Sequence, residues 1–115
     1  MSNQSDEQRA GFQLMYATFP DQETAERIAQ RLVGEQLAAC VNILPEVRSV
    51  YRWEGKVESS VEVAILIKTT SQQAGNVCDM ILLDHPFDTP AILSLNIDAK
   101  ASSSAFLEWI QSSTK

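Results

Sequence analysis

The chain offers few side chains that could do chemistry, and the first is its single histidine, His85. It precedes Pro86, and the carboxylates of Asp84 and Asp88 flank it. An imidazole with a nearby carboxylate can bind Cu(II) or Zn(II), because imidazole suits both metals. A histidine before a proline at a helix end can equally be a structural or capping residue. Both interpretations of His85 stay open.

Two cysteines, Cys40 and Cys78, are soft metal ligands in principle, but they lack the C-x-x-C spacing of common metal sites. Cys40 lies in an apolar run, and Cys78 falls on the apolar face of an expected helix. Cysteine in such surroundings behaves as a small hydrophobe. With His85, the two thiols would leave zinc short of its usual four ligands. We therefore expect buried thiols and no required cofactor, with at most a weakly held Cu(II) or other divalent cation.

A third set of residues combines aromatic and basic side chains. Tyr51 and Trp53 alternate onto one face of an expected strand, and Lys68 lies on the strand that returns beside it. The first interpretation is packing between subunits, because large aromatic side chains supply interface area. The second is a cleft between subunits that holds a small anion or metabolite, with Lys68 supplying charge and Arg52 a second donor. Glu62 would place a carboxylate near the same sheet.

No nucleophile–base pair stands out in the sequence. It contains no G-x-S-x-G, no H-E-x-x-H and no glycine-rich phosphate loop. With one histidine and four glycines, the sequence lacks the residues that most hydrolase and nucleotide-dependent mechanisms require. We therefore expect a protein that is not an enzyme.

Composition narrows the class of protein further. The length of 115 residues predicts one domain, and 44% apolar residues are enough for a core. The net charge of −6 argues against nucleic acid as a partner, since phosphate neutralisation needs clustered Lys and Arg. No stretch approaches the roughly 18 apolar residues of a membrane span, so no membrane partner is expected. The polar segment 1–11 predicts a disordered tail before a domain at 12–115, in a cytoplasmic protein.

Hydrophobic periodicity predicts the first half of the fold. A short alternating strand covers 12–18, and Asp21 is placed to cap the helix that follows, whose apolar stripe runs over 25–33. Ser71 is expected to cap a second helix, which ends at His85.

A long hairpin is expected between these helices. One strand covers 40–53 and is interrupted at Pro45, where a bulge or kink is expected. Glu54-Gly55 predicts a tight turn, and the return strand covers 57–69. Each arm is far longer than the usual strand of about five or six residues. The outer half of such a hairpin needs another surface, and we infer a partner subunit.

The remaining elements complete an α+β fold. A strand is expected over 93–97, and a C-terminal helix over 103–111 that docks through Phe106, Leu107 and Ile110. The order β-α-β-β-α-β with a C-terminal helix predicts a ferredoxin-like antiparallel sheet with helices on one face.

Several short segments, spread over nearly the whole domain, follow a pattern known from one family. They are Ala38-Ala39-Cys40-Val41-Asn42-Ile43, Pro45, Ser49-Val50-Tyr51-Arg52-Trp53-Glu54-Gly55-Lys56, Glu62-Val63, Ile67-Lys68-Thr69, His85-Pro86-Phe87 with Pro90, and Trp109-Ile110. These segments closely resemble the CutA family, and the similarity runs from about Tyr16 to Ile110.

The resemblance implies a ferredoxin-like subunit that forms a compact homotrimer, a role in divalent-cation tolerance, and copper binding. The sequence departs from the family pattern at several polar positions. Ala17 stands where some relatives carry a cysteine, and Asp84 where some carry a second histidine. Phe87 replaces a tyrosine and Ala91 a glutamate. Each change removes a ligand or polar contact, so copper binding does not carry over wholesale.

The leading hypothesis is therefore a cytoplasmic homotrimeric binding or regulatory protein associated with divalent-cation tolerance. An enzyme or a small-metabolite-binding signalling module, with its site between subunits, is the first alternative. A purely structural assembly protein is the second.

Overall fold

The computed structural model describes residues 11–115, so the expected tail lies outside the described residues except for Gly11. The carbonyl of Gly11 accepts a hydrogen bond from the backbone N–H of Ser71. The elements are β1 (Phe12–Phe19), α2 (Gln22–Gly34), β2 (Cys40–Trp53), β3 (Lys56–Thr70), α3 (Ser71–Asp84), β4 (Ile92–Asn96), the 3-10 turn η1 (Ala99–Ala101) and α4 (Ser104–Ser113).

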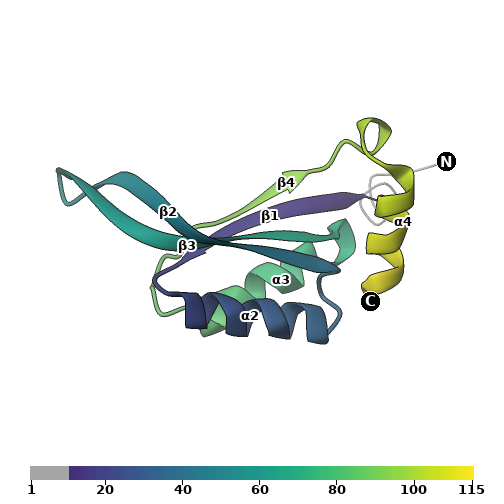
Figure 1. Cartoon of the computed structure of the whole chain (residues 1–115), viewed down its shortest axis with the longest axis horizontal. Coiled ribbons are helices and arrows are strands. Elements are labelled where there is room, and N and C mark those ends of the chain that lie inside the picture. The colour runs from purple at the N-terminus through teal and green to yellow at the C-terminus, as the bar shows by residue number, and fades with distance from the viewer. Residues whose placement is uncertain (1–10) are drawn as a thin grey trace.

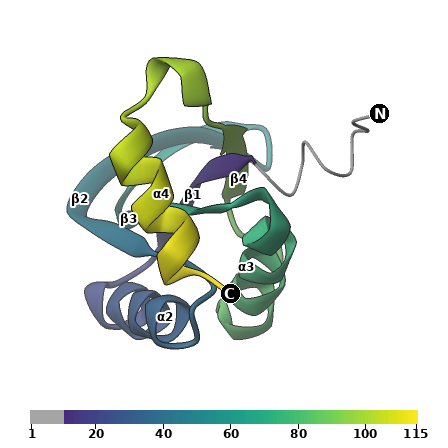
Figure 2. The ribbon, with the colours of Figure 1, turned by 90° about the vertical axis from the view of Figure 1, so that its right-hand side faces the viewer.

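The four strands form one antiparallel sheet in the order β2-β3-β1-β4. Helices α2 and α3 lie side by side on one face of this sheet, and the opposite face is left open (Figures 1 and 2). The fold is therefore ferredoxin-like, as the element order predicts. Among the helices that the structure describes, none is both long and apolar enough to cross a membrane.

The core lies between the sheet and these two helices. Alternation along β1 points Met15, Ala17 and Phe19 toward the helices, and all three are buried. The other large side chains of the core are Ile28, Leu32, Val63, Ile65, Ile67, Val77, Met80 and Ile81. Leu14 and Tyr16 alternate with the buried residues of β1 and therefore belong to the open face.

The ends of the helices follow capping rules. Asp21 caps α2, because its carboxylate accepts the Thr24 N–H at 2.8 Å. The prediction that Ser71 caps α3 is wrong by one residue. Thr70 has extended backbone angles and its hydroxyl accepts the N–H of Gln73 at 3.3 Å, so Ser71 is the first helical residue.

The turn of the hairpin has two residues, as predicted. Glu54 and Gly55 have φ values of 49° and 78°, and two successive positive values define the type I′ turn that suits a twisted hairpin. The bulge expected at Pro45 is also present, since the pairing register shifts between Leu44 and Val47.

Residues 47–62, which we call the hairpin arm, project beyond the helices (Figure 1). The Cα radius of gyration is 15.3 Å, whereas a compact domain of this length has about 13 Å. Val50 and Trp53 stay 68% and 62% exposed on opposite faces of the arm. A single chain therefore leaves large side chains exposed on both faces of its own hairpin arm.

Helix α4 covers one end of the sheet (Figure 2). Leu107 and Ile110 are buried there together with Ala39, as predicted. The expected docking of Phe106 is wrong. Its ring stacks on Trp109 with centroids 5.4 Å apart, and both side chains remain 44% exposed.

Candidate functional site

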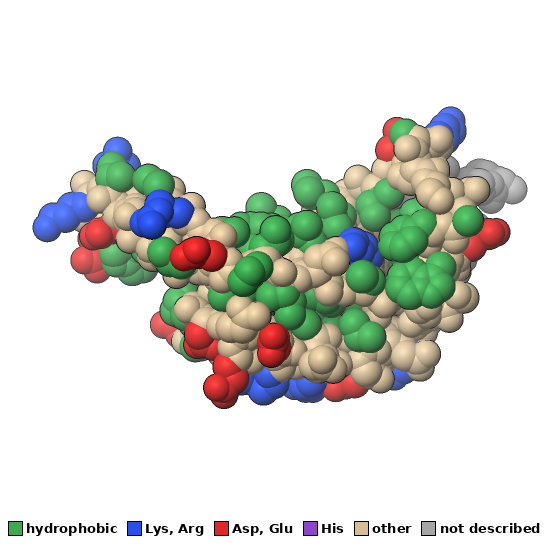
Figure 3. Space-filling view, in the orientation of Figure 1, with side chains coloured by type: hydrophobic (Ala, Val, Ile, Leu, Met, Phe, Trp, Pro, Cys, Tyr) green, Lys and Arg blue, Asp and Glu red, His purple; other side chains and the backbone are tan. Residues whose placement is uncertain are grey.

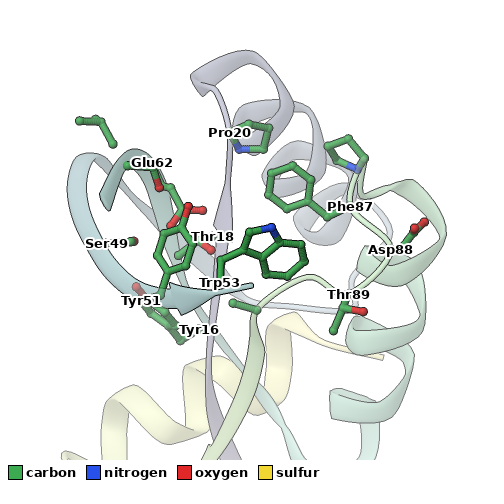
Figure 4. A pocket seen from close by; sticks show the side chains of 14 residues that line it. Tyr16, Thr18, Pro20, Ser49, Tyr51, Trp53, Glu62, Phe87, Asp88 and Thr89 are labelled. Carbon is green, nitrogen blue, oxygen red and sulfur yellow. The ribbon is translucent and has the colours of Figure 1, made fainter. Parts of the chain in front are cut away.

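A cavity of about 890 Å³ opens on the uncovered side of the sheet, beside the hairpin arm. Its wall is made by β1, by both strands of the arm and by the loop after α3 (Figure 4). The lining residues are Tyr16, Thr18, Pro20, Ser49, Tyr51, Trp53, Ser60, Val61, Glu62, Pro86, Phe87, Asp88, Thr89 and Ala91.

Strand alternation and register bring the arm residues to this cavity. Ser49, Tyr51 and Trp53 lie two residues apart on β2, so they share a face. Ser49 pairs with Ser60 of β3, which brings Glu62 to the same face one pleat further along. Figure 4 shows Tyr51 and Trp53 beside one another and Glu62 on the Tyr51 side of the opening.

His85 anchors the loop that forms the opposite wall. Its Nε2 donates to the carbonyl of Thr18 at 2.8 Å, and its Nδ1 accepts the N–H of Phe87 at 3.1 Å. These partners assign the proton to Nε2, since a carbonyl only accepts and an N–H only donates. The imidazole stacks on Phe19 at 4.8 Å and contacts the Phe87 ring at 5.1 Å between centroids.

This geometry favours the structural interpretation of His85. Both ring nitrogens already have partners, and the ring is buried. Asp84 does not approach the ring and instead pairs with Arg27 at 3.5 Å and Arg31 at 3.8 Å. In residues 11–115 no group of three or more His, Cys, Asp or Glu could hold a metal. Metal binding by His85 stays a prediction, and it would require Nδ1 to leave the Phe87 N–H.

The structure does not bring Lys68 together with Tyr51 and Trp53 in one subunit. Lys68 pairs with Cys40 in the register, whereas Tyr51 pairs with Glu58. Ten residues along a strand span roughly 33 Å. The Lys68 ammonium hydrogen-bonds the Asn42 side chain and lies 3.7 Å from the Cys40 sulfur. A cleft shared between subunits, in which a partner's lysine would approach, stays a prediction.

Arg52, the expected second cationic donor, also lies outside the cavity. Its guanidinium faces the Gly55 carbonyl at 3.5 Å, at the tip of the arm. Among the described residues that line the cavity, the charged ones are Glu62 and Asp88. The charge of the cavity is therefore opposite to the one that an anion site requires.

Sequence reasoning missed Tyr16 and Thr18 as lining residues. Both lie on the open face of β1, but they reach the cavity only because β1 pairs with β3, with Thr18 opposite Ala64. No local pattern predicts that pairing. The position of Lys68 could have been found, because counting back from the Glu54-Gly55 turn and allowing for one extra residue at the Pro45 bulge places it opposite Cys40 rather than Tyr51.

Both thiols are free, and each is half-buried rather than fully buried as expected. Cys78 packs against the core.

The fold and the cavity define a ferredoxin-like α+β protein with a cavity on the open face of its sheet. Residues 13–113 match the family described as "CutA1 divalent ion tolerance protein". The chain belongs to this family.

Relatives from distant organisms share the similarity. The "Divalent-cation tolerance protein CutA" of Archaeoglobus fulgidus is 43% identical over 96 residues, which cover 84% of this chain and 91% of that protein. "Protein CutA 1, chloroplastic" of rice is 37% identical over 102 residues, or 89% of this chain. The chain spans only 56% of that rice protein's length and 55% of its Arabidopsis thaliana counterpart.

Solved structures agree with the fold. The crystal structure of CutA1 from Oryza sativa superimposes with a TM-score of 0.86 at 35% identity, covering 91% of this chain and 94% of that one. The divalent cation tolerance protein of Thermus thermophilus gives 0.85 at 36% identity, covering 90% and 99%.

Proposed function

We propose that the chain acts as a homotrimeric binding or regulatory module connected with divalent-cation tolerance. The observation that carries the proposal is the uncovered apolar surface of the sheet. Leu93 and Leu95 of β4 are exposed on the open face, and Tyr51 and Trp53 continue this surface onto the hairpin arm. Figure 3 shows hydrophobic side chains along the floor of the hollow between the arm and the α4 end.

A second copy of the chain suits this surface better than solvent does. Burying apolar area stabilises a complex by about 25 cal/mol per Å² before the costs of association are subtracted. The arm also exposes Val50, Val57 and Val61 on its other face, so one neighbour on each side would cover it. The resemblance implies a compact homotrimer whose hairpins pack around neighbouring subunits, which would cover both faces of each arm.

Sedimentation equilibrium of the full chain tests this assembly. We expect a mass three times the 12.7 kDa of one chain, independent of concentration over the micromolar range. A mass of one chain would contradict the proposal.

The proposal includes weak binding of a divalent cation. Cu(II) would compete with the Phe87 N–H for Nδ1 of His85, so we propose a weak site and no required metal. Calorimetric titration of the wild type and His85→Ala with Cu(II) tests it. A lower heat in the variant supports His85 as a ligand, and identical isotherms remove it.

Binding is proposed in preference to catalysis. The single histidine is occupied by Thr18 and Phe87, so the described lining holds no hydroxyl group paired with a histidine, and its candidate bases are the Glu62 and Asp88 carboxylates. A signalling module that binds a metabolite remains the first alternative, and the cavity supports it. A purely structural assembly protein would use the same open face but would leave the cavity without a ligand.

The cytoplasmic location stays a prediction. The rice and Arabidopsis relatives are named as chloroplastic and the Archaeoglobus fulgidus protein as periplasmic, so location varies among the relatives.

A further inference from the structure

We propose that the cavity beside the hairpin arm receives the Lys68 side chain of a neighbouring copy, whose ammonium group pairs with Glu62 between the aromatic rings. The inference deepens the proposed assembly and rests on it. It names a contact that fixes how one subunit lies on the next, and it makes the cavity a site that only a partner subunit completes.

The first observation is the chemistry of the cavity. Tyr51 and Trp53 line it from the arm, and Phe87 lines it from the loop after α3 (Figure 4). The charged groups among the described lining residues are the carboxylates of Glu62 and Asp88. Aromatic faces attract an ammonium group within about 6 Å of the ring centre, and nearby carboxylates favour it further. The cavity therefore suits a cation.

The second observation is that the proposed assembly covers the Glu62 carboxylate. Glu62 is already half-buried in a single chain, and none of the ion pairs within residues 11–115 includes it. A neighbour on the open face would remove more water from this carboxylate, and a buried charge without a countercharge is costly. The neighbour that covers the cavity therefore has to supply a cation.

The third observation is that Lys68 is the cation best placed on the neighbour. Strand alternation puts it on the open face, where it pairs with Leu14 of β1 in the register. Among the lysines and arginines of residues 11–115, it is the one that a strand carries on this face outside the hairpin arm. Arg48 and Arg52 lie on the other face of the arm, and Lys56 lies at its tip.

Lys68 lacks a countercharge in its own chain. Its ammonium group hydrogen-bonds the Asn42 side chain and lies 3.7 Å from the Cys40 sulfur, and neither of these groups is a carboxylate. An ammonium group has three donors, so the bond to Asn42 leaves others for a partner. Within one chain, β3 rises by roughly 20 Å from Glu62 to Lys68. A pair between these two residues therefore requires two chains.

The positions of the two charges define the direction of the contact. Lys68 lies toward the α4 end of the sheet, since its carbonyl accepts the N–H of Ala39, which packs against α4. Glu62 is the last residue of the hairpin arm. Their pairing joins the arm of one copy to the α4 end of the next, and such head-to-tail contacts close into rings when the rotation permits. Repeated once per subunit, the contact fills one cavity in each of three copies.

Exchange of the two charges tests the pairing in the full-length protein. The proteins compared are wild type, Lys68→Glu, Glu62→Lys, the double variant with both changes, and the control Glu26→Lys. Glu26 is exposed on α2 in the helix layer, away from the open face. Light scattering at increasing urea gives the concentration at which the mass of each protein falls below three chains. Far-ultraviolet circular dichroism in buffer checks that each variant is folded.

We expect each single change to lower this urea concentration, or to give a smaller mass already in buffer, because it places like charges together in the cavity. The double variant should regain most of the loss, since it restores an opposite pair with the two residues exchanged. Glu26→Lys should match wild type. Losses that add in the double variant would overturn the pairing, and so would single variants that match wild type.

The same experiment separates the pairing from the assembly. If wild type has a three-chain mass and the losses add in the double variant, the pairing falls while the proposed trimer stands. A single-chain mass for wild type would overturn both.

Discussion

The Nε2 atom of His85 lies 2.8 Å from the carbonyl oxygen of Thr18, which connects the end of α3 to the end of β1 across 67 residues of sequence. The bond is buried, and it holds the loop that carries Phe87 against the sheet. The single histidine of the chain is thus explained by packing before any ligand is considered.

Replacing His85 with alanine should destabilise the protein. The Thr18 carbonyl would lose its buried donor, and an unsatisfied buried group costs about 1–3 kcal/mol. We expect the free energy of unfolding, measured by urea denaturation, to fall by about that amount. His85→Gln, whose amide can donate, should lose less. Equal stability of wild type and His85→Ala would contradict the structural role.

The Asp21 cap predicts a specific acid dependence. The N–H of Thr24 donates to the Asp21 carboxylate and lowers its pKa from the ordinary value of 3.8. A carboxyl group with a lowered folded-state pKa contributes stability above its unfolded pKa and loses it as the pH falls through the folded pKa. Asp21 therefore stabilises the protein above about pH 4 and stops doing so in stronger acid.

Asp21→Asn separates the charge from the cap, because asparagine caps helices nearly as well. We expect the variant to lose less stability than wild type when the pH is lowered from about 5 to about 2.5, as followed by urea denaturation at each pH. Parallel pH profiles for the two proteins would show that the carboxylate charge is not involved.

Gln36, the second residue after α2, carries backbone strain that glycine would relieve. Gln36 has φ of 60°, and its N–H and that of Leu37 close the helix on the carbonyls of Val33 and Leu32. Glycine is the usual residue at this position because it lacks the Cβ penalty. We expect Gln36→Gly to raise the free energy of unfolding by about 0.5–1 kcal/mol in urea. Gln36→Val should lower it, and the reverse order would contradict the strain argument.

Local patterns account for most of the fold. Periodicity, the Asp21 cap and the Glu54-Gly55 turn act within a few residues, so the sequence alone predicts the helices and the hairpin. The capping error at Ser71 is of the same local kind, because neighbouring hydroxyl residues compete for the cap. Local patterns do not predict the pairing of strands that lie far apart in the sequence, such as β1 with β3.

The site was predicted less completely, because it also depends on contacts between segments that lie far apart in the sequence. Tyr51 and Trp53 share a face by alternation, so their grouping was predictable and the cavity contains both. Lys68 also lies on the open face, but facing the same side does not place residues near each other along a long strand. The partner wall comes from the loop after α3, whose position depends on the contact of His85 with Thr18.

The central claim is that the open face of the sheet is the surface through which three copies of the chain assemble. Light scattering on three proteins tests this claim most directly. Leu95 on the open face is 57% exposed, and Leu83 on α3 is 90% exposed, so Leu95→Glu and Leu83→Glu are a matched pair on opposite layers. We predict a three-chain mass for wild type and Leu83→Glu, and a smaller mass for Leu95→Glu, because a buried carboxylate would have no partner. A single-chain mass for wild type, or dissociation by Leu83→Glu alone, would contradict the account.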